Sequence, residues 1–383
     1  MELTISLFFL FISSTLAYNC DIPTSKTHVS YRASQPIILD GLLGDEAWSK
    51  VPWTDYFGNI QGSNGPAPPS SINTRVKMMW DDKYLYIGAV MHEPVIRANT
   101  EKPVVGEPYL DNDFRLYLDY DRSNQNYKVL QMNALGLYKS VILDKSPHQN
   151  GTERPWDLGD DFKYKIYVHG SVNDPNWEPV EGGFWSLEWQ IPIAKLNSKT
   201  YHKRGSPGIP SYMNFQFLRT GFPRKSVVNL ATQSTTNTSP AYFLFGVNPN
   251  NTSQILQKRH NKRYQLSWTP QYSDDPNNPE LWGSIMFRDT TDTHQSYIKD
   301  PSASTRFALM QIYYAEVEYS KKQHGKFTNA YDKLDLNSTV IGHCTPIPKI
   351  KVSHECMEFE ASVKFGKQTG HINQDKQLYF TNH

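Results

Sequence analysis

The sequence predicts a mainly β protein: an antiparallel β-sandwich, jelly-roll or immunoglobulin-like, with a small C-terminal α+β appendage. Apolar and polar residues alternate through residues 74–80 and again through 84–90, and Asp81-Asp82-Lys83 separates the two runs. Two alternating runs joined by a short polar turn are typical of a β-hairpin with one buried face. Further short runs follow at fairly regular spacing, which favours a sandwich.

The strand at residues 111–121 carries the same alternation, with Phe114, Leu116 and Leu118 on the face expected to be buried. On a later strand, Asn214 and Gln216 are expected to point outward. An antiparallel sheet can leave one face to solvent, so we expect a polar face that is free for a ligand. The other expected strands are 127–133, 137–143, 164–168, 184–191, 213–218 and 281–287.

The hydrophobic period changes at Asp300, where the appendage (residues 300–383) is expected to begin. Asp300 can cap a helix with Pro301 in its first position, and Gly325 can end it. A short second helix near 331–334 and a strand at 357–363, paired with 378–380, complete the expected appendage. The apolar residues at helical spacing are Phe307, Met310, Tyr314 and Val317.

The N-terminus has features of a secretory signal peptide, residues 1–17. Residues 7–12 are mostly apolar, and Thr15-Leu16-Ala17 is a small-residue cleavage site. No other run is long enough to span a membrane, so we expect a secreted, extracellular protein without a membrane span. Five Asn-x-Ser/Thr sequons fit a glycoprotein: Asn150, Asn237, Asn250, Asn251 and Asn337.

The chain contains three cysteines. In an oxidising compartment we expect the local pair Cys344–Cys356 to form a disulfide, which leaves Cys20 unpaired. Pro346 and Pro348 lie between the two paired cysteines, in a turn-rich loop that a disulfide can close.

The formal net charge of +1 gives no electrostatic reason to expect a nucleic acid partner. The basic run at residues 258–263 is interpreted as a solvated loop, with a phosphate-binding patch as the alternative. Core packing is the expected role of tryptophans that fall on strands, whereas Trp156 lies in a loop, where it either contacts a ligand or plugs the structure. The strand tryptophans are Trp80, Trp185, Trp189 and Trp282.

Carboxylates are dense in one short segment, at Asp111, Asp113, Asp119 and Asp121. Hard cations favour clustered carboxylate and carbonyl oxygens, so calcium is one interpretation and solvated strand ends are the other. A glycosidase would need two carboxyl groups that face one sugar, one of them with a raised pKa. The sequence offers no such pair, and no catalytic residue is predicted.

Several motifs between residues 37 and 287 are individually weak but specific as an ordered set. They are Ile38-Leu39-Asp40-Gly41, Asp45-Glu46-Ala47-Trp48, the run 76–87, Asp111-Asn112-Asp113-Phe114, Met132-Asn133-Ala134-Leu135-Gly136, Pro155-Trp156-Asp157, Glu188-Trp189-Gln190-Ile191-Pro192, Ser267-Trp268-Thr269-Pro270 and Pro279-Glu280-Leu281-Trp282-Gly283. In this order they resemble family 9 carbohydrate-binding modules. The resemblance implies a β-sandwich over residues 30–290, an extracellular location, glycan binding and often a structural calcium ion.

The resemblance also implies a sugar site with two aromatic side chains and polar side chains on adjacent strands. Aromatic rings suit the apolar C–H face of a pyranose, whose hydroxyls need directional partners. Tyr109 falls at the first aromatic position, Gln216 matches an amide position, and Arg115 stands where the motif usually has Glu. Candidates for the second aromatic are Trp268, Tyr272 and Trp156.

We therefore expect a protein that binds a poly- or oligosaccharide without covalent chemistry, with no cofactor beyond the calcium ion that the resemblance implies. Two alternatives stay open. The first is a hydrolase of O-glycosyl bonds in carbohydrate catabolism, because some family members are joined to glycan-cleaving enzymes. The second is an extracellular interaction or scaffold protein that keeps the fold without the sugar site, which Arg115 and the unmatched second aromatic favour.

Overall fold

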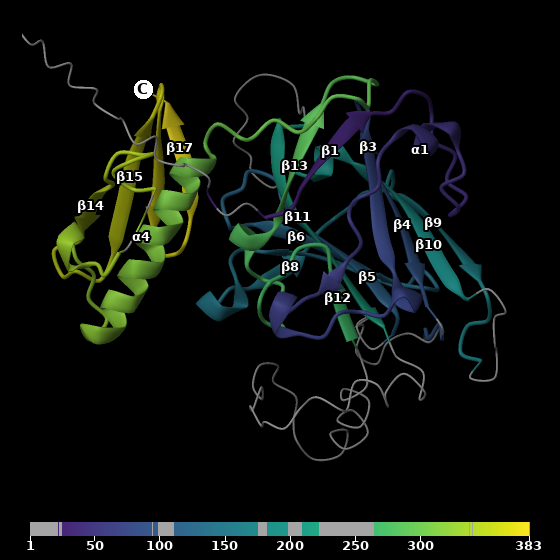
Figure 1. Ribbon diagram of the computed structural model, residues 1–383, viewed down its shortest axis with the longest axis horizontal. Helices are drawn as coiled ribbons and strands as arrows, with labels where there is room; N and C mark the ends of the chain where they lie inside the picture. Colours follow the sequence, from purple (N-terminus) through teal and green to yellow (C-terminus); the bar gives the residue numbers. More distant parts are fainter. Residues whose placement is uncertain are drawn as a thin grey trace, which may run out of the picture. The chain divides into compact units, whose positions relative to one another are not determined.

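The computed structural model describes residues 22, 25–93, 95–98, 111–174, 182–197, 209–221, 264–336, 338 and 340–382 (Figure 1). The chain divides into two compact units. The larger contains Thr24–Asp300 together with Asp375–Tyr379, and the smaller contains Pro301–Gln374 and Phe380–His383. Within the described parts of the chain, no helix is both long and apolar enough to cross a membrane.

The predicted hairpin is present as β3 (Thr74–Trp80) and β4 (Tyr84–His92), which pair antiparallel with Trp80 opposite Leu85. Asp81 closes the turn, because its Oδ1 accepts the backbone N–H groups of Lys83 and Tyr84, both at 2.7 Å. Short Asx turns of this kind explain why a polar triplet separates the two apolar runs.

The other strands of the larger unit fall close to the predicted ones, with four short strands in addition. They are β1 (Thr27–Arg32), β2 (Gly58–Asn59), β5 (Asp113–Asp119), β6 (Tyr127–Asn133), β7 (Tyr138–Leu143), β8 (Glu153–Pro155), β9 (Lys163–His169), β10 (Phe184–Pro192), β11 (Tyr212–Gly221), β12 (Tyr264–Ser267) and β13 (Gly283–Arg288). β1, β2, β8 and β12 are the four strands that the sequence did not predict.

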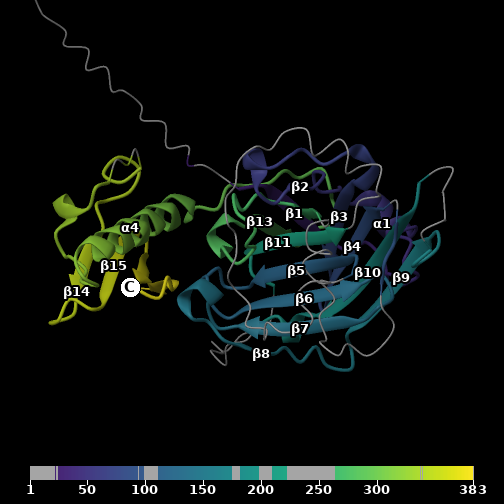
Figure 2. The same cartoon turned by 90° about the horizontal axis from the view of Figure 1, so that it is seen from below.

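These strands form one curled sheet in the order β8-β7-β6-β5-β11-β13-β1-β3-β4-β10-β9, with β12 and β2 attached through β11. Figure 2 shows β5, β6, β7 and β8 side by side. The expectation of a purely antiparallel sheet is corrected at β1, which pairs parallel with both β13 and β3. The sheet is therefore mixed.

The two halves of the curled sheet face each other across one core. The rings of Phe114 on β5 and Trp189 on β10 have centroids 5.3 Å apart, and the indole Nε1 of Trp189 donates to Sδ of Met132 on β6 at 3.2 Å. We call β7, β6, β5 and β11 the β5 layer, and β3, β4, β10 and β9 the β10 layer. Their outer faces lie on opposite sides of the sandwich. Trp80, Trp185 and Trp189 pack in this core, as predicted. Trp282 is buried too, but it precedes β13 and belongs to a separate cluster.

The smaller unit begins with the helix α4 (Ala303–Lys322). Its N-cap is Ser302 and not Asp300, because the Asp300 carboxylate pairs with Arg122 at 2.7 Å. Gly325 ends the helix as predicted, with a φ of +87° and an N–H group that donates to Ser320 O at 2.9 Å.

The buried stripe of α4 differs from the predicted one. Tyr314 is 46% exposed, whereas Leu309 and Ile312 are completely buried. Of the four predicted residues, Met310 is buried and the other three are not. The prediction left out Ala308 and Glu316, which are small or charged and yet buried. The full buried set is Thr305, Ala308, Leu309, Met310, Ile312, Tyr313 and Glu316.

A four-stranded sheet, β14 (Lys349–Val352), β15 (Phe359–Phe365), β16 (Gln368–Asn373) and β17 (Leu378–Asn382), accompanies the helix in that order. The strand predicted at 378–380 therefore neighbours β16 and not the strand predicted at 357–363. The reason is that residues 368–373, which the sequence analysis left unassigned, form a strand between the two. A 3₁₀ turn at Tyr331–Lys333 stands where the short helix was predicted.

The predicted Cys344–Cys356 disulfide is wrong. Cys356 has a free thiol, whereas Cys344 takes part in a disulfide. The two cysteines occupy separate turns, each with its own backbone hydrogen bonds. Cys344 donates its N–H to Val340 O at 2.8 Å, and Cys356 donates to Ser353 O at 2.9 Å between β14 and β15. Closeness in sequence therefore does not pair them.

Candidate functional site

The predicted ligand face is the outer face of the β5 layer. Arg115 on β5 stands opposite Leu218 on β11, and Tyr117 stands opposite Gln216, so all four side chains share this face. Tyr117, Leu218 and Gln216 are nevertheless buried, and only 11% of the Arg115 side chain is exposed. The face that the sequence predicted to be free is thus largely covered.

The cover comes from two loops that are distant in sequence. Ile60 and Trp282 pack on this face and form a second apolar cluster with Tyr117 and Leu218. The rings of Tyr117 and Trp282 have centroids 5.6 Å apart. Outward-facing apolar residues such as Leu218 were the sequence signal for this cluster. The cluster comprises Ile60, Tyr117, Tyr127, Val129, Leu143, Leu218 and Trp282.

Arg115 is bound to a buried carboxylate on its own strand. Its Nε and Nη2 atoms lie 3.0 and 2.7 Å from Oδ2 of Asp113. Gln131 also donates to this oxygen, and the N–H of Thr220 donates to Oδ1 at 3.0 Å. Burial raises the pKa of the Asp113 carboxyl, and Arg115 opposes this shift. An arginine at this position therefore neutralises a carboxylate that would otherwise be buried alone.

Gln216 is completely buried and acts as a clamp on a loop. Its Nε2 donates to Thr269 O at 2.7 Å, and its Oε1 accepts the N–H groups of Thr269 and Phe217, both at 3.0 Å. Both ends of the amide are thus bonded to the backbone. The amide therefore holds residue 269 in place over β11.

The predicted aromatic residues are not gathered into one wall. Trp156 and Trp268 belong to the main core at 4% and 1% exposure, so their rings are not open to a sugar in this structure. Tyr272 is 58% exposed, and its φ of +56° is a left-handed conformation. Tyr109 lies outside the described residues.

The four aspartates predicted for calcium do not fit a shared ion. Both oxygens of Asp113 are bonded to protein donors, as given above. Oδ1 and Oδ2 of Asp119 accept the backbone N–H groups of Ser123 and Asn124 at 3.2 and 2.7 Å, so this carboxylate closes a turn. Within the described residues, no group of three or more His, Cys, Asp and Glu side chains could hold a metal ion.

A buried ion pair that the sequence analysis missed lies at one end of the core. Arg219 on β11 donates to Glu93, which follows β4, and both side chains are completely buried. The Tyr264 hydroxyl donates to the Glu93 carboxylate at 2.9 Å, and Arg219 also donates to Thr74 Oγ1 at 2.7 Å. Burial raises the pKa of the Glu93 carboxyl. The pair ties four strands together and exposes no charge to a ligand.

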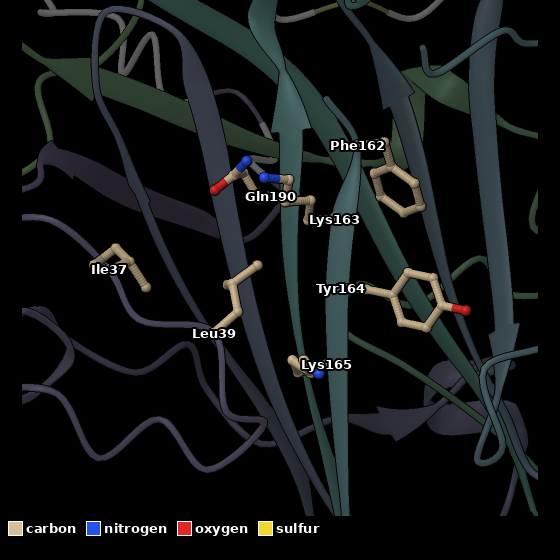
Figure 3. A pocket seen from close by; sticks show the side chains of 7 residues that line it. All are labelled: Ile37, Leu39, Phe162, Lys163, Tyr164, Lys165 and Gln190. Atoms are coloured by element: carbon tan, nitrogen blue, oxygen red, sulfur yellow. The ribbon is translucent and has the colours of Figure 1, made fainter. Parts of the chain in front are cut away.

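An open hollow lies beside β9 and β10, with a volume of about 560 Å³. Figure 3 shows the rings of Phe162 and Tyr164 at one side of the view and Ile37 and Leu39 at the other. Amide and ammonium groups add hydrogen-bond donors, so the lining combines apolar surface with polar groups. The lining residues are Ile37, Leu39, Phe162, Lys163, Tyr164, Lys165 and Gln190.

The rings beside this hollow continue on the neighbouring layer. Tyr138 at the start of β7 lies 5.4 Å from Phe162 and 5.8 Å from Tyr164, measured between ring centroids, and 42% of Tyr138 is exposed. The Tyr164 hydroxyl donates to Gly136 O at 3.1 Å. A partly exposed three-ring cluster therefore lies where the edges of the two layers meet.

Comparison with known proteins agrees with the sequence motifs. Residues 38–152 match the family described as carbohydrate family 9 binding domain-like. No characterised protein with a curated description matches the chain. Among solved structures, a family 9 carbohydrate-binding module from Caldicellulosiruptor kristjanssonii in complex with cellotriose is 17% identical, with 72% of this chain and 100% of that chain covered and a TM-score of 0.38.

Two more solved structures are similar at the same low level. The module from C. kristjanssonii in complex with glucose is 17% identical, with 71% of this chain and 100% of that chain covered and a TM-score of 0.36. A putative carbohydrate-binding protein from Bacteroides uniformis is 13% identical, with 69% of this chain and 100% of that chain covered and a TM-score of 0.44. The family match over residues 38–152 confirms the resemblance drawn from the motifs, and it covers under half of the chain.

Proposed function

We propose that this protein binds carbohydrate without covalent chemistry. The observation that carries the proposal is the family match over residues 38–152, a segment that includes β3 to β7. Solved structures that resemble the chain include a module in complex with cellotriose and one in complex with glucose. A neutral gluco-oligosaccharide is therefore the first ligand to test.

Two places for such a ligand follow, one from the sequence and one from the structure. One is the site that the resemblance implies, where Tyr109 is predicted to provide a ring and Arg115, with 11% of its side chain exposed, a polar group. The other is the hollow beside β9, where the Gln190 amide lies beside the apolar side chains of Ile37 and Leu39. The rings of Phe162 and Tyr164 border it from the other face of β9. Both combinations suit a pyranose, which needs an apolar contact and directional hydrogen bonds.

The test is a glycan-array screen of the full chain followed by titration calorimetry with the best neutral ligand. Tyr164→Ala and Tyr109→Ala separate the two places. The matched control is Tyr331→Ala in the smaller unit, where the ring lies in a 3₁₀ turn. Loss of affinity in one of the first two variants, with the control unchanged, identifies the place.

The scaffold alternative is the outcome to set against this proposal. The buried amide of Gln216 and the buried ring of Trp268 favour it, because both side chains are used inside the fold. If no glycan on the array binds at millimolar concentration, the carbohydrate proposal is overturned and the scaffold function replaces it.

Secretion and glycosylation belong to the same proposal. Asn150 is exposed in a left-handed conformation at the end of a 3₁₀ turn, which suits an acceptor asparagine in a surface loop. The sequons at Asn237, Asn250, Asn251 and Asn337 lie outside the described residues. Protein recovered from the culture medium is treated with a deglycosylating enzyme, and the decrease in its apparent mass is measured. Recovery from the medium tests secretion, and a smaller decrease in Asn150→Gln tests glycosylation of Asn150.

A further inference from the structure

The outer face of the β10 layer carries a patch of aromatic and basic side chains that the proposed function does not use. Residues 53–57 run beside β3, because Thr54 N–H donates to Val76 O at 2.8 Å and Phe57 N–H donates to Thr74 O at 3.0 Å. Phe57 lies in the main core. Tyr56, its neighbour, is 51% exposed on the outer side.

An arginine stacks on two rings within this patch. The guanidinium carbon of Arg75 lies 4.2 Å from the ring centroid of Trp53 and 5.3 Å from that of Tyr56. A stacked guanidinium keeps its N–H groups at the edge of its plane available for hydrogen bonds. The stack is therefore a flat, cationic surface with free donors.

A second row of rings lies on the same face, two residues further along β4 than the position opposite Arg75. Phe184 on β10 stands opposite His92 on β4 and opposite His169 on β9. Its ring centroid lies 5.9 Å from that of His92 and 5.2 Å from that of His169, the latter pair stacked. Both imidazoles belong to exposed residues.

The arginine stack and the row of rings are neighbours. Arg75 stands opposite Val90, two residues before His92 on the same strand, so both project from one face. Burial lowers the pKa of His92, and the positive charges of Arg219 and Arg75 lower it further, which agrees with this proximity. Two strand spacings, roughly 10 Å, separate β3 from β10.

The patch holds more positive than negative charge. Within the described residues, Arg75 has aromatic contacts and no carboxylate partner. The acidic group near the patch, Asp55, lies 3.8 Å from Lys26 and is balanced by it. An anionic ligand is favoured by this charge, and a cationic one is opposed.

We propose that the patch around Arg75 and Phe184, on the outer face of the β10 layer, is a second ligand site for an oligosaccharide that carries carboxylate or sulfate groups. Arg75 would bind the anionic group with its free edge. Trp53, Tyr56 and Phe184 would contact the apolar faces of the sugars, and the two histidines would donate or accept at hydroxyls. The site is separate from both neutral-glycan places proposed above. Arg115 lies on the opposite layer, and Gln190, which lines the hollow beside β9, lies toward the other end of β10 from Phe184.

The test is calorimetric titration of the full chain with four probes at 50 mM salt. They are a sulfated heparin tetrasaccharide, an oligogalacturonide of similar length, cellotetraose and a poly-glutamate peptide. We expect one or both anionic oligosaccharides to bind, and binding should weaken as salt is raised, because exposed charges are screened. The two anionic probes distinguish sulfate from carboxylate recognition.

Variants locate the site. Arg75→Gln should weaken binding of the anionic oligosaccharide roughly tenfold, and Arg75→Lys should recover only part of it, because an ammonium cannot replace the planar stack. Phe184→Ala should weaken binding severalfold. Lys139→Gln on the β5 layer removes the same charge elsewhere and should leave affinity unchanged. Melting curves confirm that each variant folds.

Three results overturn the proposal. The first is no binding of either anionic oligosaccharide at 50 mM salt. The second is an equal loss in Arg75→Gln and Lys139→Gln, which would indicate net charge alone. The third is poly-glutamate binding as tight as that of the oligosaccharide, which would indicate a surface for acidic peptides. Arg75→Gln should leave neutral-glycan binding intact, so the two proposals fail separately.

Discussion

The indole Nε1 of Trp48 donates a hydrogen bond to Oε1 of Glu188 over 2.6 Å, and this contact fastens the short helix α1 (Glu46–Lys50) to the outer face of β10. The other carboxylate oxygen accepts the backbone N–H groups of Asp40 and Gly41 at 2.8 and 2.6 Å. Glu188 is completely buried. One carboxylate thus organises the whole segment between residues 40 and 48.

Glu188→Gln should lower the free energy of unfolding by about 1–3 kcal/mol. The amide keeps one acceptor oxygen but turns an NH₂ group toward donors, so at least one buried N–H group loses its partner. Chemical denaturation followed by tryptophan fluorescence measures the change. Glu153→Gln on β8, an exposed carboxylate that pairs with Lys139, is the matched control. A loss no larger than the control's would contradict the assigned role.

The sequence predicted what depends on neighbours along the chain. Alternation along single strands placed Phe114 and Phe217 in the core and located the β3–β4 hairpin, because a strand with one buried face repeats every two residues. The sequence also located the end of α4, because Gly325 adopts the left-handed conformation without strain.

What the sequence did not predict depends on contacts between distant segments. Gln216 was expected on a free face, but the loops that carry Ile60 and Thr269 cover it. The buried pair of Glu93 and Arg219 is equally invisible in the sequence, because its residues are 126 positions apart. Parallel pairing of β1 required knowing which strands become its neighbours.

Glu316 in α4 should make the smaller unit less stable as pH rises. Its Oε2 accepts Thr328 N–H at 3.1 Å, while Oε1 is buried without a hydrogen-bond partner in the described structure. Burial raises the pKa of this carboxyl to about 7, from 4.5. Between these values the unfolded chain binds fewer protons than the folded one, so stability falls from pH 4.5 to pH 7.

Glu316→Gln removes this titrating group. The unfolding free energy of the variant should therefore fall less between pH 4.5 and 7 than that of the unmodified protein. Thermal melts at half-unit pH steps measure it. The control Glu318→Gln changes an exposed carboxylate two residues away, which pairs with Lys321. A decline that persists unchanged in Glu316→Gln would assign it to other groups.

Cys356 and Cys344 should react differently with an alkylating reagent. Under native, non-reducing conditions Cys356 is expected to be labelled, because its thiol is free and partly exposed. Cys344 should be labelled only after reduction. Peptide mapping by mass spectrometry measures both and identifies the partner of Cys344, for which the sequence offers Cys20. Recovery of a peptide that joins Cys344 to Cys356 would refute this assignment.

Removing calcium with a chelator should leave the melting temperature unchanged. The aspartates of β5 and of the turn after it are the predicted calcium ligands, and they are already bonded to protein donors. Their oxygens already accept hydrogen bonds from Arg115, Ser123 and Asn124, and an ion would have to displace these donors. An ion that binds only the folded state stabilises it, so a real site would be detected as a drop in melting temperature. A drop reversed by added calcium would show that a site exists elsewhere in the chain.

Tyr109→Ala and Gln216→Ala should separate ligand contact from loop support. Tyr109 is predicted to stack on a sugar, so its loss should weaken glycan affinity on the order of tenfold while the melting temperature stays unchanged. Gln216 bonds the backbone of residues 217 and 269, so Gln216→Ala should instead lower the free energy of unfolding by about 1–3 kcal/mol. Calorimetry and thermal melts on both variants give the comparison. If Gln216→Ala weakens binding without lowering stability, the amide contacts the sugar and its clamp role is secondary. If Tyr109→Ala leaves the affinity unchanged, Tyr109 does not contact the sugar and the hollow beside β9 becomes the leading place for the ligand.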